Sequence, residues 1–348
     1  MRCASAPVAL LQFAAILGLA GCGSAPVPPV APPTLPAPQA PIPARGGEVL
    51  GQSERFVIYQ PGPGDTLRSV AERFLGDPAL DWVIGDFNDI TQLQPGQPLA
   101  VPLKPLNPTG VHAGGYQTVP ILCYHRFGGA AGKMSVSPAN FAAQLDWLAR
   151  NDWHVIRLAQ LQDYLAGRQS LPRRSVVITI DDGYESSYRH AFPLLRQHGF
   201  PATVFVYTDF IGSADALNWA QMQEMAESGL IDIQAHSKTH RNLIERAAQE
   251  SEPQYRQQLE AEARLPRELL QRRLPVQVRH FAYPYGDAND AMLDVMERQQ
   301  YALAVTVTPG GNGFFAPPLM LRRTMIFGDT DLDAFKAKLQ ISRGFSAP

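Results

Sequence analysis

The stretch SVVITIDDGY, residues 175–184, decides the fold. Residues 176–180 are apolar apart from Thr179, which is typical of a strand buried on both faces of a parallel sheet. Asp181 and Asp182 follow this strand directly, and Gly183 lets the backbone turn sharply. Catalytic groups of α/β folds lie at the carboxyl ends of such strands, although an Asp-Gly pair alone is also a common turn. Residues further along the chain favour the catalytic interpretation.

Length and composition indicate a globular protein with one large domain or two unequal ones. The chain has 348 residues, of which 45% are hydrophobic and 18% charged. A formal net charge of −2 provides no basic field for nucleic acid, so no nucleic-acid partner is expected. The cysteines are not expected to form a disulfide framework, because Cys3 lies in an export segment, Cys22 lies directly after it, and Cys123 is alone in an apolar run.

The amino terminus has the features of an export signal. Residues 8–20 are apolar but too few for a permanent membrane span, and residues 19–22 read Leu-Ala-Gly-Cys. This ending resembles the lipobox of bacterial lipoproteins, which implies that residues 1–21 are removed and that Cys22 carries lipid. Gly23 rather than an aspartate follows the cysteine, which favours the outer membrane of the cell envelope, facing the periplasm. Residues 22–54, rich in proline and alanine, are expected to be a linker.

Residues 55–104 are expected to form a small βααβ domain. The pattern predicts strands at 55–59 and 99–102 and helices at 66–75 and 80–87. This order resembles a LysM module, and the resemblance rests on Gly64-Asp65-Thr66-Leu67, Trp82, Asn88 and Pro95-Gly96-Gln97. It implies binding to glycans that contain N-acetylglucosamine. A packing domain without a ligand is the alternative.

After a predicted linker at 105–117, residues 118–345 alternate between strand and helix patterns. The expected strands are residues 119–124, 154–156, 176–180, 202–207, 231–235, 280–283 and 302–307. The expected helices are residues 140–150, 158–165, 185–198, 219–228, 254–271, 288–298 and 331–339. Alternation of this kind predicts an α/β fold with a parallel sheet, a distorted or incomplete (β/α) barrel. All loops after strands would then meet at one mouth.

Two histidines at that mouth predict a metal site. His236 and His240 follow the strand at 231–235, and in a helical turn residues four apart lie on the same face. Two imidazoles and one carboxylate make a three-ligand site for Zn²⁺ or a similar ion, with positions left for water and substrate. The pKa of a bound water falls toward about 7, and the second carboxylate of the Asp181-Asp182 pair could take its proton.

Hydrolysis of an amide also needs a proton for the leaving nitrogen. His125, directly after the strand at 119–124, lies at the same mouth and has a suitable pKa range, with a packing histidine as the alternative. The loop FAYPYGD, residues 281–287, offers aromatic rings for a sugar and a backbone N–H at Tyr285 for an oxyanion, unless it is only a tight turn.

Together the segments ITIDDG (178–183), HSKTH (236–240) and FAYPYG (281–286) resemble the polysaccharide deacetylase family, carbohydrate esterase family 4, with its NodB-homology domain. The resemblance implies that Asp181 is the base, that Asp182, His236 and His240 bind the metal, and that the Tyr285 backbone belongs to the oxyanion hole. The implied metal is Zn²⁺, with Co²⁺ or Ni²⁺ as alternatives. Two departures are Tyr283, where many members have arginine, and the absence of any histidine after His280 to supply the usual acid.

The early Tyr124-His125 pair and the FAYPYG form resemble the branch that deacetylates poly-N-acetylglucosamine exopolysaccharide. That branch implies His125 as the acid and Arg323 as the residue that orients Asp181, with Arg322 as a competitor. The sequence therefore predicts a lipid-anchored, metal-dependent N-deacetylase of a polysaccharide containing N-acetylglucosamine. Peptidoglycan is the alternative substrate, and a non-catalytic glycan-binding lipoprotein is the alternative function.

Overall fold

The structure is a computed structural model that describes residues 46–104, 106–129 and 132–344, all in the unit Arg45–Pro348. The predicted signal peptide at 1–21, the predicted lipid site Cys22 and most of the predicted linker lie outside the described residues. No helix among the described residues is long and apolar enough to cross a bilayer.

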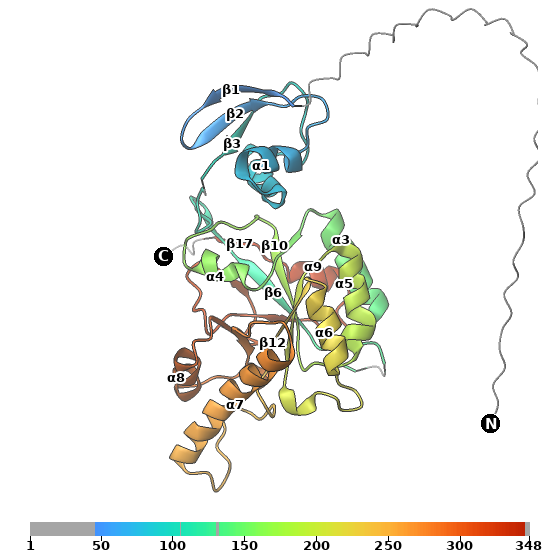
Figure 1. The fold of residues 1–348 in the computed structure, drawn as a ribbon, viewed down its shortest axis with the longest axis vertical. Helices are drawn as coiled ribbons and strands as arrows, with labels where there is room; N and C mark the ends of the chain where they lie inside the picture. Colours follow the sequence, from blue (N-terminus) through green and yellow to red (C-terminus); the bar gives the residue numbers. More distant parts are fainter. Residues whose placement is uncertain (1–45, 105, 130–131, 345–348) are drawn as a thin grey trace, which may run out of the picture. The chain divides into compact units, whose positions relative to one another are not determined.

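Residues 48–102 form an antiparallel sheet packed on two helices (Figure 1). Its elements are β1 (Glu48–Gln52), β2 (Phe56–Gln60), α1 (Leu67–Leu75), η1 (Pro78–Leu80), α2 (Asp81–Asn88) and β3 (Leu99–Pro102). Thr66 begins α1 with a reciprocal capping box to Ser69, and Tyr59, Val70 and Ile84 fill the core. The four predicted elements are confirmed. Strand β1 lies in the segment predicted to be linker. The sequence did not predict it, because its side chains are mostly exposed and leave no alternating burial pattern.

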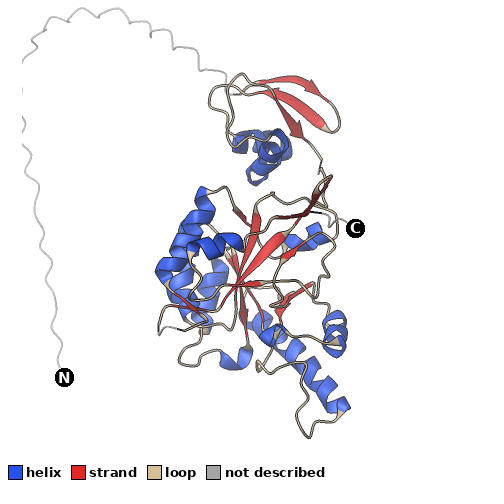
Figure 2. Cartoon of the chain, turned by 180° about the vertical axis from the view of Figure 1, so that it is seen from behind, coloured by secondary structure: helices blue, strands red, loops and turns tan. Residues whose placement is uncertain are grey.

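The larger part of the chain is a curled, mostly parallel sheet with helices outside it (Figures 1 and 2). The parallel strands run in the order β14 (Leu303–Val305), β13 (His280–Ala282), β12 (Ile231–Ala235), β11 (Ala202–Val206), β10 (Ser175–Ile180) and β6 (Val119–Tyr124). The helices are α3 (Pro138–Arg150), α4 (Gln160–Leu165), α5 (Phe192–His198), α6 (Trp219–Glu227), α7 (Glu252–Arg273), α8 (Asp290–Arg298) and α9 (Leu332–Ala337). The predicted alternation of strands and helices is confirmed.

Short strands complete the curl and were not predicted. Leu321 bridges Val305 at the end of β14, and β16 (Thr324–Met325) pairs with β6, so this segment lies between the two edges of the sheet. Strand β15 (Gly311–Asn312) pairs antiparallel with the other end of β6. Pairs of two or three residues are too short to show a period, so only the tertiary fold defines them.

Further pairs lie outside the main sheet. The predicted linker at 105–117 contains β4 (Val111–His112) and β5 (Gly115–Gln117), which pairs with β17 (Ser342–Gly344). Strand β7 (Arg126–Phe127) pairs with β8 (Ser135–Val136). Strand β9 (His154–Val155) belongs instead to the main sheet, where it pairs parallel with the start of β10. The segment at 105–117 is therefore partly ordered by pairing rather than a free linker.

The parallel strands are buried on both faces, as their apolar runs predict: every residue of β6, β10 and β11 is buried. His280 at the start of β13 is a polar exception. It is 3% exposed, and its Nδ1 atom has no hydrogen-bond partner among the described residues. Burial, aided by the nearby Arg279 charge, lowers its pKa to about 4. His280 is therefore neutral in the folded protein.

This burial predicts an acid-sensitive stability. Because His280 takes up a proton near pH 6.5 when unfolded but only near pH 4 when folded, stability is lost as the pH falls through that window. Between pH 7 and pH 5 we expect the native protein to lose about 2 kcal/mol more free energy of unfolding than His280→Leu. Denaturant titrations of both proteins at the two pH values measure this, and parallel losses would contradict it.

Candidate active site

The two aspartates after β10 point to different partners. Asp181 continues the sheet through a hydrogen bond from its N–H to Tyr124 O (2.9 Å), and Asp182 then turns with φ 73°. Gly183 also has a positive φ, and a Cβ there would lie 2.8 Å from Val206 Cγ1, so glycine is required. The sharp turn separates the two carboxylates.

Asp182 lies between the two predicted histidines. Its Oδ1 is 3.3 Å from Nε2 of both His236 and His240. The expected helical turn is absent: Ser237 and His240 have left-handed backbone conformations, with φ 71° and 62°. The imidazole rings nevertheless approach to 4.8 Å between centroids. The loop thus brings both rings to one carboxylate without helical geometry.

These three residues fit a divalent metal ion. Ligand atoms on a tetrahedral zinc ion lie about 3.3 Å apart, which matches both distances from Asp182 to histidine nitrogen. Nδ1 of His236 is 2.7 Å from Ala282 O, so this nitrogen donates to the carbonyl and Nε2 is left for the metal. Burial disfavours the charged forms of Asp182 and His236. The hydrogen bonds to both histidines outweigh it for Asp182 and hold its pKa well below the usual range, while bonding to Asp182 and the aspartate charges raise the pKa of His236.

Asp181 is held by a buried arginine instead. Nη1 and Nη2 of Arg323 each donate to one of its oxygens at 2.7 Å, and neither side chain is more than 2% exposed. Nε of Arg323 also donates to Thr306 O (2.8 Å). Burial alone would raise the pKa of Asp181, but the charges of Arg323 and His236 and the hydrogen bonds from Arg323 together outweigh burial and lower the pKa. Of the two arginines considered, Arg323 and not the exposed Arg322 reaches Asp181.

A second group of ligand-type side chains, Cys123, His125 and Asp181, does not suit a metal. Both oxygens of Asp181 are bonded to Arg323. Burial raises the pKa of the Cys123 thiol well above its ordinary value, so the thiolate is disfavoured, and Sγ lies 3.5 Å from Asp181 Oδ2. Cys123 is thus a buried neighbour of Asp181, in keeping with its prediction as a core residue.

His125 directly follows β6 and faces both aspartates. Burial lowers its pKa, and the charges of Asp181 and Asp182 partly oppose this. Its Nδ1 atom is buried without a partner among the described residues. Protein contacts therefore do not fix its tautomer, and Nδ1 or Nε2 is free to hold a proton for a bound molecule.

The loop after β13 supplies Tyr285. Tyr285 has φ 61°, its side chain is 60% exposed, and its ring lies 5.0 Å from that of His240. No acceptor for its backbone N–H is found in the described part of the chain. Phe281 and Tyr283 are instead buried, and the hydroxyl of Tyr283 donates to Leu319 O (3.0 Å). Of the aromatic rings predicted to contact sugar, only that of Tyr285 is exposed.

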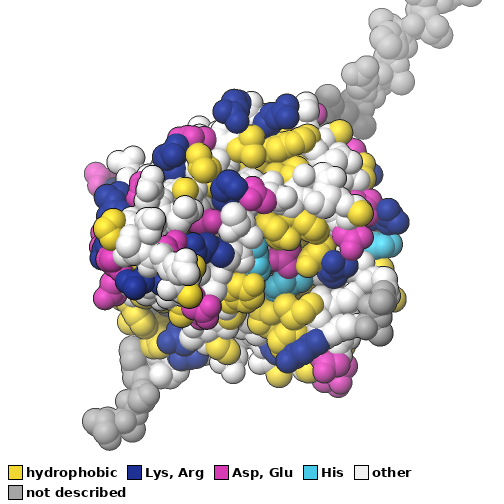
Figure 3. All heavy atoms as spheres, turned by 90° about the horizontal axis from the view of Figure 1, so that it is seen from below, with side chains coloured by type: hydrophobic (Ala, Val, Ile, Leu, Met, Phe, Trp, Pro, Cys, Tyr) yellow, Lys and Arg dark blue, Asp and Glu magenta, His cyan; other side chains and the backbone are white. Residues whose placement is uncertain are grey.

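A cavity of about 350 Å³ joins these groups. The predicted residues that line it are His125, Asp181, Asp182, His236, His240 and Tyr285, whereas Arg323 lies behind Asp181. Figure 3 shows histidine and acidic side chains recessed among hydrophobic ones on one face. The apolar lining residues Met134, Val307 and Met325 were not predicted, because they lie in short strands or loops without periodicity.

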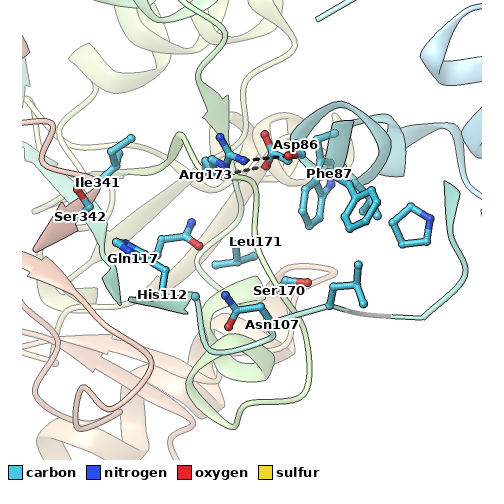
Figure 4. Close-up of a pocket in the computed structure, with 15 residues that line it drawn as sticks. Asp86, Phe87, Asn107, His112, Gln117, Ser170, Leu171, Arg173, Ile341 and Ser342 are labelled. Atoms are coloured by element: carbon cyan, nitrogen blue, oxygen red, sulfur yellow. Dashed lines mark hydrogen bonds between the residues drawn. The ribbon is translucent and has the colours of Figure 1, made fainter. Parts of the chain in front are cut away.

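A larger hollow, of about 690 Å³, lies away from these residues (Figure 4). Its lining includes the aromatic side chains Trp82 and Phe87. Arg173 donates to Asp86 there, from Nη2 to the carbonyl (2.9 Å) and from its backbone N–H to the carboxylate (3.0 Å). None of the predicted catalytic or metal-binding residues lines this hollow.

Comparison with known proteins finds similarity to one family. Residues 168–304 match the family model described as polysaccharide deacetylase. The matched segment is therefore similar to polysaccharide deacetylases. YxkH of Bacillus subtilis (strain 168), named for the same family, is 30% identical over 192 residues, which cover 55% of this chain and 65% of that relative. The poly-β-1,6-N-acetyl-D-glucosamine N-deacetylase of Staphylococcus aureus (strain MRSA252) is 26% identical over 197 residues, covering 54% and 68%.

The fold of the larger part of the chain also has a solved counterpart. IcaB from Ammonifex degensii superposes with a TM-score of 0.58 at 28% identity, over 65% of this chain and 98% of that chain. The predicted α/β fold with a curled sheet is confirmed by this match. The curated relatives extend beyond the matched region, since about a third of YxkH has no counterpart in it.

The buried ion pair generates a stability prediction. Replacing Arg323 with methionine leaves the Asp181 charge buried without its partner, so we expect a loss of about 3–5 kcal/mol in the free energy of unfolding. Asp181→Asn in the Arg323→Met background should recover part of this loss. Denaturant titrations of the single and double variants measure the coupling, with the exposed Arg322→Met as control. Additive effects of the two substitutions would rule out the proposed pairing.

Proposed function

We propose that this protein is a metal-dependent N-deacetylase that removes acetyl groups from N-acetylglucosamine units of a polysaccharide. The observation that carries the proposal is the placement of Asp182, His236 and His240 around one point, beside a separate ionised carboxylate, Asp181, in one cavity. Such a three-ligand set leaves positions open, which distinguishes catalytic from structural zinc sites.

A divalent cation at this site would polarise the acetyl carbonyl and lower the pKa of a bound water. Asp181, kept ionised by Arg323, would accept the proton of the attacking water. His125 would donate a proton to the departing nitrogen; its lowered pKa makes the protonated form scarcer but a stronger acid. The unpaired N–H of Tyr285 would stabilise the oxyanion. These roles use each predicted residue once.

The substrate that we favour is an exopolysaccharide of the poly-N-acetylglucosamine type. Support comes from the Tyr124-His125 pair and from the name of the Staphylococcus aureus relative. Peptidoglycan is the second candidate, because the sequence of residues 55–104 resembles a glycan-binding module. Acetate release from poly-N-acetylglucosamine oligomers compared with muropeptide glycans separates the two.

Two substitutions separate chemistry from metal binding. We expect Asp181→Asn to keep the metal but to lose acetate release by about 10²-fold or more, because only the proton acceptor is removed. His236→Ala should lose both, because it removes a ligand. Metal content and acetate release are measured on each purified variant after reconstitution with Zn²⁺.

The same measurements test the alternative function. Acetate release by either variant at the native rate would contradict the assigned roles. A native protein that binds no divalent metal and releases no acetate would favour the non-catalytic glycan-binding lipoprotein.

Residues 55–104 are proposed to be a LysM module that holds the glycan, and Cys22 to be the lipid attachment site that anchors the chain in the outer membrane facing the periplasm. The support for both is sequence resemblance, and for the module also its two helices and paired strands. An anchor and a linker would hold the module and the cavity near envelope glycans.

The anchor has its own test. Cys22→Ala should abolish incorporation of labelled palmitate and release the protein from the membrane fraction, because the acylated thiol is gone. Cys3→Ala is the matched control and should change neither. Membrane retention of Cys22→Ala would contradict lipid anchoring.

A further inference from the structure

A buried carboxylate on α7 contacts the loop that carries the two histidines. Asp181 and Glu262 are the acidic side chains classed as buried in the described part of the chain, each 2% exposed. Asp181 has Arg323 as its partner, but Glu262 forms no ion pair with any described residue. The Arg241 charge lies near Glu262 without an ion-pair contact, so this buried carboxylate needs other hydrogen-bond donors.

Those donors all come from the histidine loop. Oε2 of Glu262 accepts hydrogen bonds from the backbone N–H groups of Lys238 (2.8 Å) and Thr239 (2.9 Å). Oε1 accepts from the hydroxyl of Thr239 at 2.7 Å. One side chain of α7 thus satisfies the two consecutive N–H groups between His236 and His240.

The opposite side of the loop is held by the chain after β11. Thr208 N–H donates to Ser237 O (3.3 Å), and Asp209 N–H donates to Lys238 O (2.9 Å). The loop between these attachments contains two left-handed residues, Ser237 and His240. Such conformations persist only where surrounding structure imposes them, and Glu262 supplies that structure on one side.

We infer that Glu262 is a positioning residue for the metal site: it fixes the 236–240 loop so that both imidazoles face Asp182 before a metal binds. The inference rests on the proposed metal-dependent function. Outer partners that orient ligands typically change metal affinity by about 10- to 100-fold when removed. Glu262 would act one step further out, through the backbone that carries the ligands.

The test measures Zn²⁺ affinity by chelator competition with the purified full-length protein. Glu262→Leu removes all three acceptors at similar volume, and we expect its affinity to fall by about tenfold or more. Glu262→Gln should stay within about threefold of native, because its amide oxygen can accept both N–H groups and Thr239 can accept from the amide nitrogen. Rescue by glutamine separates hydrogen bonding from bulk packing.

Tyr301→Phe is the matched control. It removes a buried hydrogen bond from the Tyr301 hydroxyl to Ala263 O (2.8 Å), one residue further along α7, and leaves the histidine loop untouched. Its Zn²⁺ affinity should be native. A second readout uses metal-free protein: the amides of Lys238 and Thr239 should exchange hydrogen faster in Glu262→Leu but not in Tyr301→Phe.

If Glu262→Leu does not fold, Thr239→Val removes one of the three bonds and should weaken Zn²⁺ binding by a smaller factor. Native affinity and native amide exchange in the folded leucine or valine variant would overturn the inference while leaving the proposed function standing. Equal losses in the glutamine and leucine variants would also overturn it. Failure of the native protein to bind Zn²⁺ would instead overturn both.

Discussion

The bidentate pair between Arg323 and Asp181 is the constraint on which the site depends. Burying a guanidinium group is costly unless its donors are paired, and here they bond Asp181, Thr179 and the carbonyl of Thr306. These bonds link β10, the chain after β14 and the closing segment, residues 321–325, which pairs with the chain at β14 and with β6. Asp181 is thereby ionised and both of its oxygens are bonded to Arg323, each keeping a second lone pair, so the adjacent Asp182 is the carboxylate left to face the histidines.

The separation of the two carboxylates follows from backbone geometry. Successive side chains of a strand point to opposite faces, and the left-handed turn at Asp182 increases the divergence. Three of the non-glycine residues with positive φ, Asp182, His240 and Tyr285, line the cavity, and a fourth, Ser237, lies in the loop between the two histidines. Strained conformations gather at functional sites, where surrounding structure maintains them. The cavity combines strained loops with rigid parallel strands.

The sequence predicted most of the scaffold and the residue types of the site, but not how the site is held. Buried apolar runs such as β6 and β10 predict strands directly, because both faces are covered. Strand β1 is mostly exposed in its hairpin with β2, and β16 depends on pairing with the distant β6, so neither left a periodic pattern. The choice between Arg322 and Arg323 needed the register of that closing segment. Glu262 gave no signal, because an acidic residue in a highly charged helix resembles a solvent-exposed one.

The histidine loop shows why spacing alone was insufficient. A helical turn would satisfy its N–H and C=O groups internally and would direct residues four apart to one side. The observed loop sends the N–H groups of Lys238 and Thr239 to Glu262 and the carbonyls of Ser237 and Lys238 to the chain after β11. Both of its faces are therefore attached to the sheet and helix layers, and these bonds offset the left-handed strain. Tertiary contacts, not local helix propensity, set the direction of the two imidazoles, so a sequence can name the ligands without showing how they converge.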